Sequence, residues 1–598
     1  MIMKTIPFYS MRITDSFWSE RQQTVRDTTV WAVYDRFYET GRIPTLDCSW
    51  QEGQPNKPHH FWGSDVFKWV EGAAYIMESH PIEKLREAVD DFICRIAKGI
   101  RENGYYNSFY NTLNLPIYTK RDDHELYSLG HMIEAGIAWA HATGDDRLLQ
   151  MACRGADHAD KVFRQEDSAG FDTPGHEEIE LALMRLYHYT KNDRYLALAR
   201  HFLDRRGQGP KDTPNDRIKT DEKYSQFHLP VRQQREAVGH AVRAVYLYCA
   251  MADLALETGD PELEEAVEAI FTDITEKKMY ITGGIGSLYA GETFSAAYHL
   301  PNQKAYAETC AALGFALFCR RLLSIRPDSR YADAAERALY NGMHSGLSLD
   351  GKAFFYINPL EMDLAACDIP YERQHAPQRQ EVFSCSCCPP NLVRLIPAIG
   401  DFVYSCEEDT LFVHQYIANE AHFDGFHASI VGSYPYDGHL RVSCPGKRLA
   451  LRRPGWCSHY TASAPCTEKD GYLYFDCDSV EVEFDMTPTF LTAASDVHAD
   501  QGRVALMRGP LVYCAEGLDQ PADIFRCRID PDAPVTETAD TIAGFPILEA
   551  SGHITPTQNT LYVPYRKVAP TPCKLRLIPY FAFANRGKSN MQTWILTV

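Results

Sequence analysis

Two patterns of apolar and polar positions divide this chain. Before Val403, apolar residues recur at spacings of three and four, as they do in helices that bury one face. This pattern predicts about twelve helices. The clearest are expected at residues 65–79, 82–101, 125–141, 177–189 and 239–257. After Val403, apolar and polar residues alternate in short segments separated by Gly, Pro and Asp, which indicates β-strands.

A four-residue joint recurs between the expected helices. Its copies are Thr143-Gly-Asp-Asp, Thr190-Lys-Asn-Asp and Thr258-Gly-Asp-Pro, and Arg326-Pro-Asp-Ser resembles a fourth. Each joint ends one helix and offers an Asp that can cap the N-terminus of the next. Helical hairpins joined in this way, without strands between them, predict a closed ring of six hairpins, an (α/α)6 barrel. The loops of such a barrel surround a central pocket, where functional residues are expected.

The strand-rich region follows the barrel directly. Strands are expected at residues 410–417, 439–444, 448–453, 472–475 and 480–484, with others at 510–513 and 575–580. Because 598 residues exceed what one hydrophobic core organises, the chain is predicted to be a multidomain α+β protein. We expect an N-terminal (α/α)6 barrel at 1–402. A C-terminal β-sandwich region is expected at 403–598, as one large or two small sandwiches.

Charge and composition narrow the function. The formal net charge of -20, without a run of Lys and Arg, excludes nucleic acid as a partner, since phosphate backbones are bound by clustered basic residues. No apolar segment has the length of a membrane span, and the first ten residues lack the apolar core of a signal peptide. We therefore expect a cytoplasmic protein with no membrane partner. The 18 cysteines are scattered through helical and strand-like segments, so most are expected to be reduced thiols.

The densest chemical signal is a cysteine motif just before an expected helix. The motif is Cys385-Ser-Cys387-Cys388-Pro-Pro-Asn391, and the pair Glu308-Thr-Cys310 near the start of another helix offers two more ligand types. Together they exceed the four ligands of a tetrahedral zinc site. Neither motif has the two-residue gap of zinc fingers. The spacing alone leaves three interpretations open: buried structural thiols, a structural zinc and a catalytic zinc thiolate.

Four motifs together resemble glycoside hydrolase family 127, which contains the β-L-arabinofuranosidases. They are Gly291-Glu292-Thr-Phe, Ala307-Glu308-Thr-Cys310, Phe354-Phe355-Tyr356-Ile-Asn-Pro-Leu-Glu361 and Cys387-Cys388-Pro-Pro-Asn391. The similarity continues into the strand-rich region. It is carried there by Leu449-Ala-Leu-Arg-Arg-Pro-Gly-Trp456, Arg508-Gly-Pro-Leu-Val-Tyr513 and Ile578-Pro-Tyr-Phe-Ala-Phe-Ala-Asn-Arg586, so the resemblance covers nearly the whole chain.

The resemblance implies a catalytic zinc site. Zn²⁺ would be held by Glu308, Cys310, Cys387 and Cys388, with Cys387 as the nucleophile and Glu292 as the general acid and base. The implied enzyme is a retaining exo-glycoside hydrolase that releases β-linked L-arabinofuranose, or a related furanose, from oligosaccharides. Attack by the thiolate would give a thioglycosyl intermediate, which parallels the retaining scheme with two carboxylates.

The resemblance also suggests which residues bind the sugar. His124, His176 and His240 each begin an expected helix, where an imidazole can bond the hydroxyls of a furanose. Tyr356 is similar in position to a family tyrosine that approaches the sulfur and the sugar. His131 competes with His124 for this role. Either Glu177 or Glu178 can join His176, and two tryptophans can form a sugar platform but are expected to serve packing: Trp62 and Trp69.

Other functions remain open at this stage. A sugar epimerase or isomerase can use the same barrel with several pocket histidines, and it needs no thiolate cluster. A non-catalytic carbohydrate-binding protein with a structural zinc is a second alternative. The role of Cys385 is undecided between a spectator, a replacement ligand and a redox partner of Cys387. The sequence does not determine the oligomeric state, although a sandwich face can support a homodimer.

Overall fold

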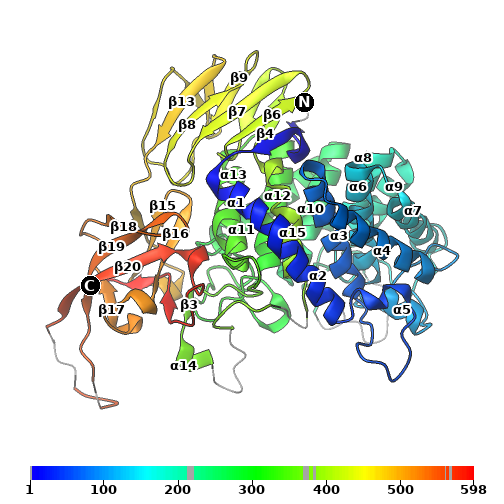
Figure 1. Ribbon diagram of the computed structural model, residues 1–598, viewed down its shortest axis with the longest axis horizontal. Coiled ribbons are helices and arrows are strands. Elements are labelled where there is room, and N and C mark those ends of the chain that lie inside the picture. Colours follow the sequence, from blue (N-terminus) through cyan, green and yellow to red (C-terminus); the bar gives the residue numbers. More distant parts are fainter. Residues whose placement is uncertain are drawn as a thin grey trace.

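The computed structural model describes residues 3–209, 211, 221–367, 376–381, 385–558, 560–564 and 569–598. It consists of a helical ring, a pair of facing sheets from the middle of the chain and a larger sheet from its end (Figure 1). This is the expected multidomain architecture of an (α/α)6 barrel followed by strand-rich sheets.

Among the described residues, six helices form an inner ring. Each contacts the next, and the last packs against the first, so the ring is closed. These helices are α3 (Trp62–Ser79), α6 (Glu125–Thr143), α8 (Ile179–Thr190), α10 (Ala241–Thr258), α12 (Thr309–Ile325) and α15 (Cys388–Leu395). The ring closes tightly, because a Cβ at Gly72 of α3 would lie 2.6 Å from Cγ1 of Val393 in α15.

The outer layer pairs each inner helix with a neighbour. Its helices are α2 (Val30–Glu39), α4 (Glu83–Gly99), α7 (Arg147–Ala159), α9 (Asp193–Arg205), α11 (Pro261–Lys277) and α13 (Ser329–Arg337). The expected joints connect inner to outer helices. Side chains of Asp260 and Asp328 cap α11 and α13 as predicted, whereas Asn192 rather than Asp193 caps α9. Three further helices are α1 (Ser16–Thr24), α5 (Ser108–Thr112) and α14 (Leu364–Cys367).

Two six-stranded sheets follow the barrel. One has the order β1-β4-β5-β9-β12-β11 and the other β10-β13-β8-β7-β6-β2. Their strands are β1 (Lys4–Thr5), β2 (Met11–Ile13), β4 (Tyr404–Glu407), β5 (Thr410–Val413), β6 (Asn419–Phe423), β7 (Phe426–Gly432), β8 (His439–Ser443), β9 (Arg448–Arg452), β10 (Tyr460–Ala462), β11 (Thr467–Lys469), β12 (Tyr472–Phe475) and β13 (Ser479–Phe484). Strands β1 and β2 come from the N-terminal segment, so the sheets include residues outside 403–598. The domain boundary at 402 therefore stays a prediction.

A ten-stranded sheet ends the chain. Its main order is β14-β15-β16-β20-β19-β17, with β18, β21, β22 and β3 at its margins. The strands are β3 (Glu361–Met362), β14 (Thr489–Leu491), β15 (Arg503–Arg508), β16 (Leu511–Glu516), β17 (Cys527–Ile529), β18 (Thr536–Ile542), β19 (Phe545–Ile554), β20 (Thr571–Pro579), β21 (Met591–Gln592) and β22 (Ile595–Leu596). Strand β3 ties a barrel loop to this sheet, because it pairs with β21.

Helix α1 joins all three parts. The ring of its Phe17, which is 1% exposed, lies 5.4 Å from the ring of Tyr340 in the barrel. The same ring lies 6.4 Å from Tyr436, next to the six-stranded sheets, and 5.9 Å from Phe545 in β19. One apolar core therefore continues through the barrel and the sheets, and it fixes the loops of the barrel in place.

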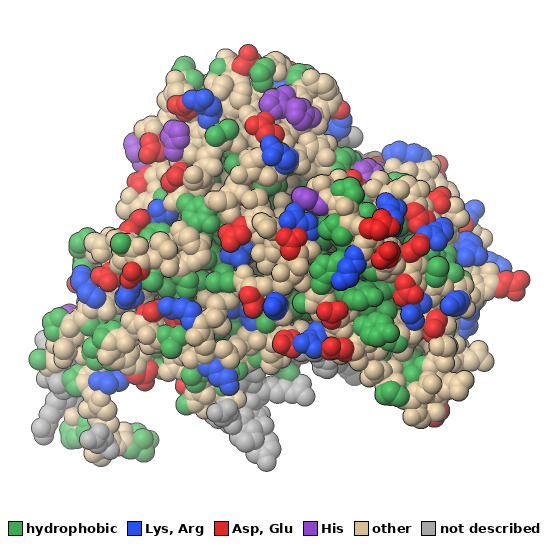
Figure 2. Space-filling model, in the orientation of Figure 1, with side chains coloured by type: hydrophobic (Ala, Val, Ile, Leu, Met, Phe, Trp, Pro, Cys, Tyr) green, Lys and Arg blue, Asp and Glu red, His purple; other side chains and the backbone are tan. Residues whose placement is uncertain are grey.

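The face of the molecule shown in Figure 2 is mixed in charge. On this face, Lys and Arg side chains are interspersed with Asp and Glu side chains over both the barrel and the sheets. None of the helices in the described ranges has the length and apolarity needed to cross a membrane.

Candidate active site

A cavity of about 400 Å³ lies at the N-terminal ends of the inner helices. Every inner helix or the loop before it contributes to its wall. The lining includes His60, His124, His176, His240, Arg243, Glu292, Glu308, Cys310, Tyr356, Cys385 and Cys387. The cavity thus brings together residues that are far apart in the sequence.

The N-termini of two neighbouring inner helices meet at the wall of this cavity and carry four donor atoms. Glu308 is the N-cap residue of α12 and Cys310 lies in its first turn, while Cys387 is the N-cap residue of α15 and Cys388 begins it. Prolines follow Cys388 at the next two positions, which favour the first turn of a helix because their missing N–H groups need no partner there. The partial positive charge of both helix ends favours ionised thiols and a carboxylate.

The four donors have the spacing of a metal site. The sulfur of Cys310 lies 3.6 Å from that of Cys387 and 3.2 Å from that of Cys388, and the latter two sulfurs are 3.8 Å apart. An oxygen of Glu308 lies 3.4 Å from the Cys387 sulfur. In a tetrahedral zinc site with thiolate bonds of about 2.3 Å, sulfurs are separated by about 3.8 Å. The residues therefore fit a tetrahedral ion that accepts soft sulfur ligands.

Glu292 lies beside this cluster in a strained turn. Its φ of 58° follows a φ of 74° at Gly291, and two successive left-handed residues turn its side chain into the cavity. Tyr306 donates its hydroxyl to Glu292 at 2.7 Å, and Nε2 of His240 lies 2.7 Å from the other carboxylate oxygen. Burial alone would raise the pKa of Glu292, but the bonds from His240 and Tyr306 outweigh it and lower that pKa to about 2.

The tautomer of His240 follows from its position as the N-cap residue of α10. Its Nδ1 accepts a hydrogen bond from the backbone N–H of Val242 at 3.2 Å. A neutral imidazole that accepts at Nδ1 carries its proton on Nε2, which faces Glu292. His240 is therefore a hydrogen-bond donor to this carboxylate.

The other two expected histidines also line the cavity. Nδ1 of His124 lies 2.8 Å from the carbonyl oxygen of Asp122, and Nδ1 of His176 lies 2.9 Å from that of Glu177. Carbonyl oxygens only accept, so in both rings Nδ1 donates and Nε2 remains an acceptor for a sugar hydroxyl. Burial lowers the pKa of both histidines well below its ordinary value, which keeps them neutral.

The structure also places the residues that the sequence left open. His131 is fully buried and its Nδ1 lies 3.1 Å from Glu178, so of the two competing histidines only His124 lines the cavity. Trp69 is 1% exposed and donates its indole N–H to the carbonyl of Val30, and Trp62 packs against Arg42. Neither tryptophan lines the cavity, in agreement with the packing interpretation.

Tyr356 and Cys385 complete the wall near the sulfurs. The hydroxyl of Tyr356 lies 3.5 Å from the sulfur of Cys387 and 3.8 Å from that of Cys385. The backbone carbonyl of Tyr356 accepts from the N–H of Thr309, which joins its loop to the start of α12. Cys385 is outside the four-donor group, so it borders the cavity without belonging to the cluster.

Sequence reasoning missed several wall residues. His60 precedes α3 just as His124 precedes α6, so the same pattern of a histidine before an inner helix could have found it. Arg243 lies in the motif that supplied His240 and could have been selected with it. Tyr306 bonds Glu292 from a loop in which no pattern distinguishes it, so only the fold reveals its role.

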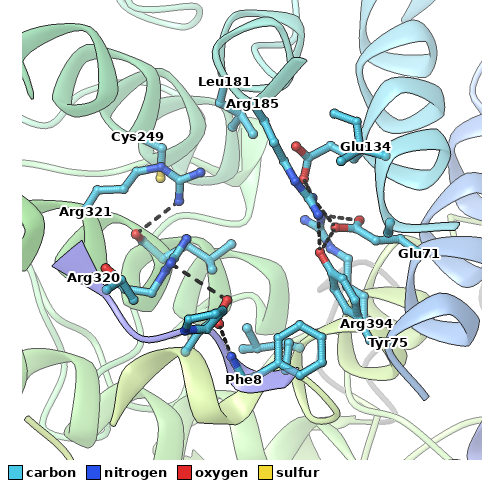
Figure 3. Close-up of a pocket in the computed structure, with 18 of the residues that line it drawn as sticks. Phe8, Glu71, Tyr75, Glu134, Leu181, Arg185, Cys249, Arg320, Arg321 and Arg394 are labelled. Atoms are coloured by element: carbon cyan, nitrogen blue, oxygen red, sulfur yellow. Dashed lines mark hydrogen bonds and ion pairs between the residues drawn. The ribbon is translucent and has the colours of Figure 1, made fainter. Parts of the chain in front are cut away.

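A second cavity of about 480 Å³ occupies the opposite end of the barrel, and we call it the rear cavity. Figure 3 shows Glu71, Tyr75, Glu134, Arg185 and Arg394 gathered on one side of it, with ion pairs between them. Its lining contains paired charges and a single thiol, Cys249, but no group of metal donors among the described residues. The chemistry therefore belongs to the cavity with the thiol cluster.

Comparisons with known proteins agree with this arrangement. Residues 10–401 match the catalytic domain of the β-L-arabinofuranosidases of glycoside hydrolase family 127, and residues 488–596 match the C-terminal domain of that family. A protein of Bifidobacterium longum subsp. longum named non-reducing end β-L-arabinofuranosidase is 34% identical over 98% of this chain and 99% of its own.

Solved structures show the same relationship. A family 127 β-L-arabinofuranosidase from Geobacillus stearothermophilus T6 is 36% identical, with a TM-score of 0.91 over 98% of this chain and 100% of its own. A second family 127 β-arabinofuranosidase is 33% identical, with a TM-score of 0.89 over 100% of this chain and 98% of its own. The chain therefore belongs to glycoside hydrolase family 127, and it is a glycoside hydrolase.

Proposed function

We propose that this protein is a retaining exo-β-L-arabinofuranosidase that uses Cys387 as its nucleophile and Glu292 as its general acid and base. The observation that carries this proposal is the position of Cys387. Its sulfur lies within 3.8 Å of two other thiols, a carboxylate oxygen and the hydroxyl of Tyr356, in the wall of the same cavity that contains Glu292.

The names of the relatives and the shape of the cavity support the substrate. The proteins from Bifidobacterium longum and Geobacillus stearothermophilus are both named β-L-arabinofuranosidases, and the former acts at the non-reducing end. A cavity of about 400 Å³ lies within the range of small-ligand pockets, which suits a terminal sugar better than the middle of a polymer. We propose an oligosaccharide that ends in β-linked L-arabinofuranose or a related furanose.

The donor set supports zinc as the cofactor. Glu308, Cys310, Cys387 and Cys388 would hold the ion, since three thiolates and one carboxylate at tetrahedral spacing suit Zn²⁺. When bound, zinc supplies the positive charge that keeps the thiols ionised at neutral pH.

In the first half-reaction the Cys387 sulfur attacks the anomeric carbon of the sugar. A carbon–sulfur bond forms while the glycosidic carbon–oxygen bond breaks, and Glu292 gives the leaving oxygen a proton. The low pKa of Glu292 means that it is a carboxylate before the substrate arrives. The proton that it gives to the leaving oxygen therefore has to come from solvent before this step, while Nε2–H of His240 and the hydroxyl of Tyr306 hold its two oxygens in place.

In the second half-reaction Glu292 is the base. As a carboxylate it takes a proton from a water molecule, which attacks the anomeric carbon and displaces the thiolate of Cys387. Two inversions at the same carbon give net retention. His124 and His176 offer Nε2 acceptors to the hydroxyls of the sugar throughout, which holds the ring between nucleophile and acid.

The two earlier alternatives lose their support. Family membership favours hydrolysis over epimerisation or isomerisation. A non-catalytic carbohydrate-binding protein would not need a carboxylate such as Glu292 held against His240 and Tyr306 within the pocket. Hydrolysis remains the function that the geometry supports best.

The test is hydrolysis of p-nitrophenyl β-L-arabinofuranoside by the purified, reduced and zinc-loaded protein. Cys387→Ser and Glu292→Gln are measured beside it. We expect turnover by the wild type, with retention at the anomeric carbon, and a loss in both variants. Full activity in Cys387→Ser would refute the thiolate mechanism. A folded wild type with bound zinc and no turnover would refute the proposed sugar.

A further inference from the structure

Behind the thiol cluster, α15 carries a polar face that reaches from the sulfurs to the rear cavity. Asn391 lies three residues after Cys388, and Arg394 lies three residues after Asn391, so all three share one side of the helix. Asn391 is 0% exposed and Arg394 is 6% exposed. Neither residue touches the cavity that holds Glu292.

Both polar atoms of the Asn391 side chain make hydrogen bonds. Its side-chain nitrogen lies 3.0 Å from the sulfur of Cys310, and its side-chain oxygen accepts from Nε of Arg394 at 2.8 Å. A guanidinium can only donate, so the atom that faces Arg394 must be the amide oxygen. The amide N–H group therefore points at the sulfur, and Arg394 determines that orientation.

Arg394 is itself held on two further sides. Its Nη1 donates to Glu71 at 2.9 Å and its Nη2 donates to the hydroxyl of Tyr246 at 2.9 Å. Glu71 also accepts from Arg185 at 3.0 Å, at the margin of the rear cavity (Figure 3). Burial alone would raise the pKa of Glu71, but Arg394 and Arg185 outweigh it and lower that pKa to about 2. The guanidinium of Arg394 is thus fixed by a permanent carboxylate.

We propose that Asn391, oriented by Arg394, is a positioning residue that holds the sulfur of Cys310 as a metal ligand and leaves Cys387 as the reactive thiolate. This inference rests on the zinc site of the proposed function. A hydrogen bond from N–H to a ligand sulfur stabilises its negative charge and fixes its side chain.

The contacts of the three cysteines explain why only one of them acts as the nucleophile. Cys310 and Cys388 are 1% and 0% exposed, and the sulfur of Cys310 also accepts a hydrogen bond from the side-chain amide of Asn391. Cys310 and Cys387 both border the sugar cavity, but Cys387 is less buried than Cys310 and has the hydroxyl of Tyr356 beside it. The hydrogen bond from Asn391 therefore fixes the sulfur of Cys310 as a metal ligand. The sulfur of Cys387, which lacks this hydrogen bond, is left to react with the substrate.

The test compares Asn391→Asp with the wild type in two measurements of metal binding. One is the zinc dissociation constant, obtained by competition with a chelator. The other is the sulfur-to-metal absorption band of the cobalt-substituted protein. Aspartate keeps the shape and can still accept from Arg394, but it presents an oxygen that cannot donate to the sulfur. We expect zinc affinity to fall about ten- to a hundred-fold and the cobalt band to shift.

Asn341→Asp is the matched control. Asn341 is also 0% exposed, and its side chain both donates to the carbonyl of Pro510 and accepts from the N–H of Val512, neither of which belongs to the sulfur cluster. Asn341→Asp also introduces a buried carboxylate, but at a position that does not contact a sulfur. The cobalt absorption band of this variant should therefore match that of the wild type. Arg394→Lys, which keeps the charge beside Glu71 but loses the Nε donor, should weaken zinc binding if Asn391→Asp does not fold.

The outcomes separate this inference from the proposed function. Wild-type zinc affinity and an unchanged cobalt band in Asn391→Asp, or in Arg394→Lys when the former does not fold, would overturn the positioning role alone. A wild-type protein that binds neither zinc nor cobalt would overturn the zinc site and this inference with it. Weaker binding in both Asn391→Asp and Asn341→Asp would assign the effect to buried charge and also overturn the role.

Discussion

Replacing Glu292 with glutamine should separate the two half-reactions. Glu292 accepts one bond from the hydroxyl of Tyr306 and one from Nε2 of His240, both at 2.7 Å. Glutamine can keep both contacts, because a tyrosine hydroxyl also accepts from an amide N–H. The protein should therefore fold and bind zinc, while the variant can no longer carry a proton between the sugar and the water.

The expected loss follows from the role of this carboxylate. General acid–base catalysis contributes about 10²–10⁴ in rate, or about 3–5 kcal/mol of barrier. With an oligosaccharide, whose leaving oxygen needs a proton, Glu292→Gln should slow the first half-reaction by this amount. With an activated aryl furanoside, the first half-reaction needs no acid. Hydrolysis of the thioglycosyl enzyme then becomes limiting, so a burst of phenolate should precede a slow steady state.

Stopped-flow absorbance on the aryl furanoside measures the burst, and added azide provides the control. Azide attacks without needing a base, so it should restore turnover of the aryl substrate by Glu292→Gln and leave the wild type unchanged. Equal losses on both substrates, with no burst and no response to azide, would refute the assignment of Glu292 as acid and base.

Three further predictions concern the rest of the molecule. Burial raises the pKa of Asp500 to about 6. The free energy of unfolding should therefore fall by about 3 kcal/mol as pH rises from about 4 to 6 and this carboxyl group ionises. Asp500→Asn should accordingly unfold at a higher temperature than the wild type at pH 7, but not at pH 4. Chelation of zinc should lower the unfolding temperature, since an ion at a hundred times its dissociation constant contributes about 2.7 kcal/mol. Arg394→Ala should bind zinc weakly and recover with millimolar guanidinium, because Arg394 borders the rear cavity of about 480 Å³.

Each of these predictions has a contradicting result. For Asp500 the sign is fixed, because a raised carboxyl pKa means that the folded state binds the proton more tightly, and a variant stabilised equally at pH 4 and 7 would contradict it. For zinc, an unfolding temperature that is the same with and without the chelator would contradict a metal site that forms only in the folded protein. For Arg394→Ala, rescue by urea as well as guanidinium would exclude replacement of the lost charge.

The helical part of the fold could be predicted because its periodicity is local. Segment 125–141 is observed as α6 (Glu125–Thr143), and the joint at Thr258 ends α10 and leads to the capping Asp260. Long-range pairing could not be predicted in this way. Strands β1 and β2 precede the barrel yet pair with β4 and β6, some four hundred residues later, and no local pattern in such short strands indicates their partners.

The site shows the same division. The resemblance to the family selected Glu308, Cys310, Cys387 and Cys388, and the structure brings all four within 4.8 Å of one another. Residues that contact these four donors from other helices could not be predicted from the sequence. Asn391 lies in a quoted motif, but nothing in that motif shows that its amide would meet the sulfur of Cys310 from α12.

The account depends on the covalent bond between the sugar and sulfur, so detection of that bond is its most direct test. Zinc-loaded Glu292→Gln is mixed with the aryl furanoside, quenched in acid within the burst, digested and analysed by mass spectrometry. We predict one pentose on the peptide that contains Cys387, and none in the double variant that also carries Cys387→Ser. A pentose on a carboxylate, or turnover with no sugar on Cys387, would contradict the thiolate mechanism.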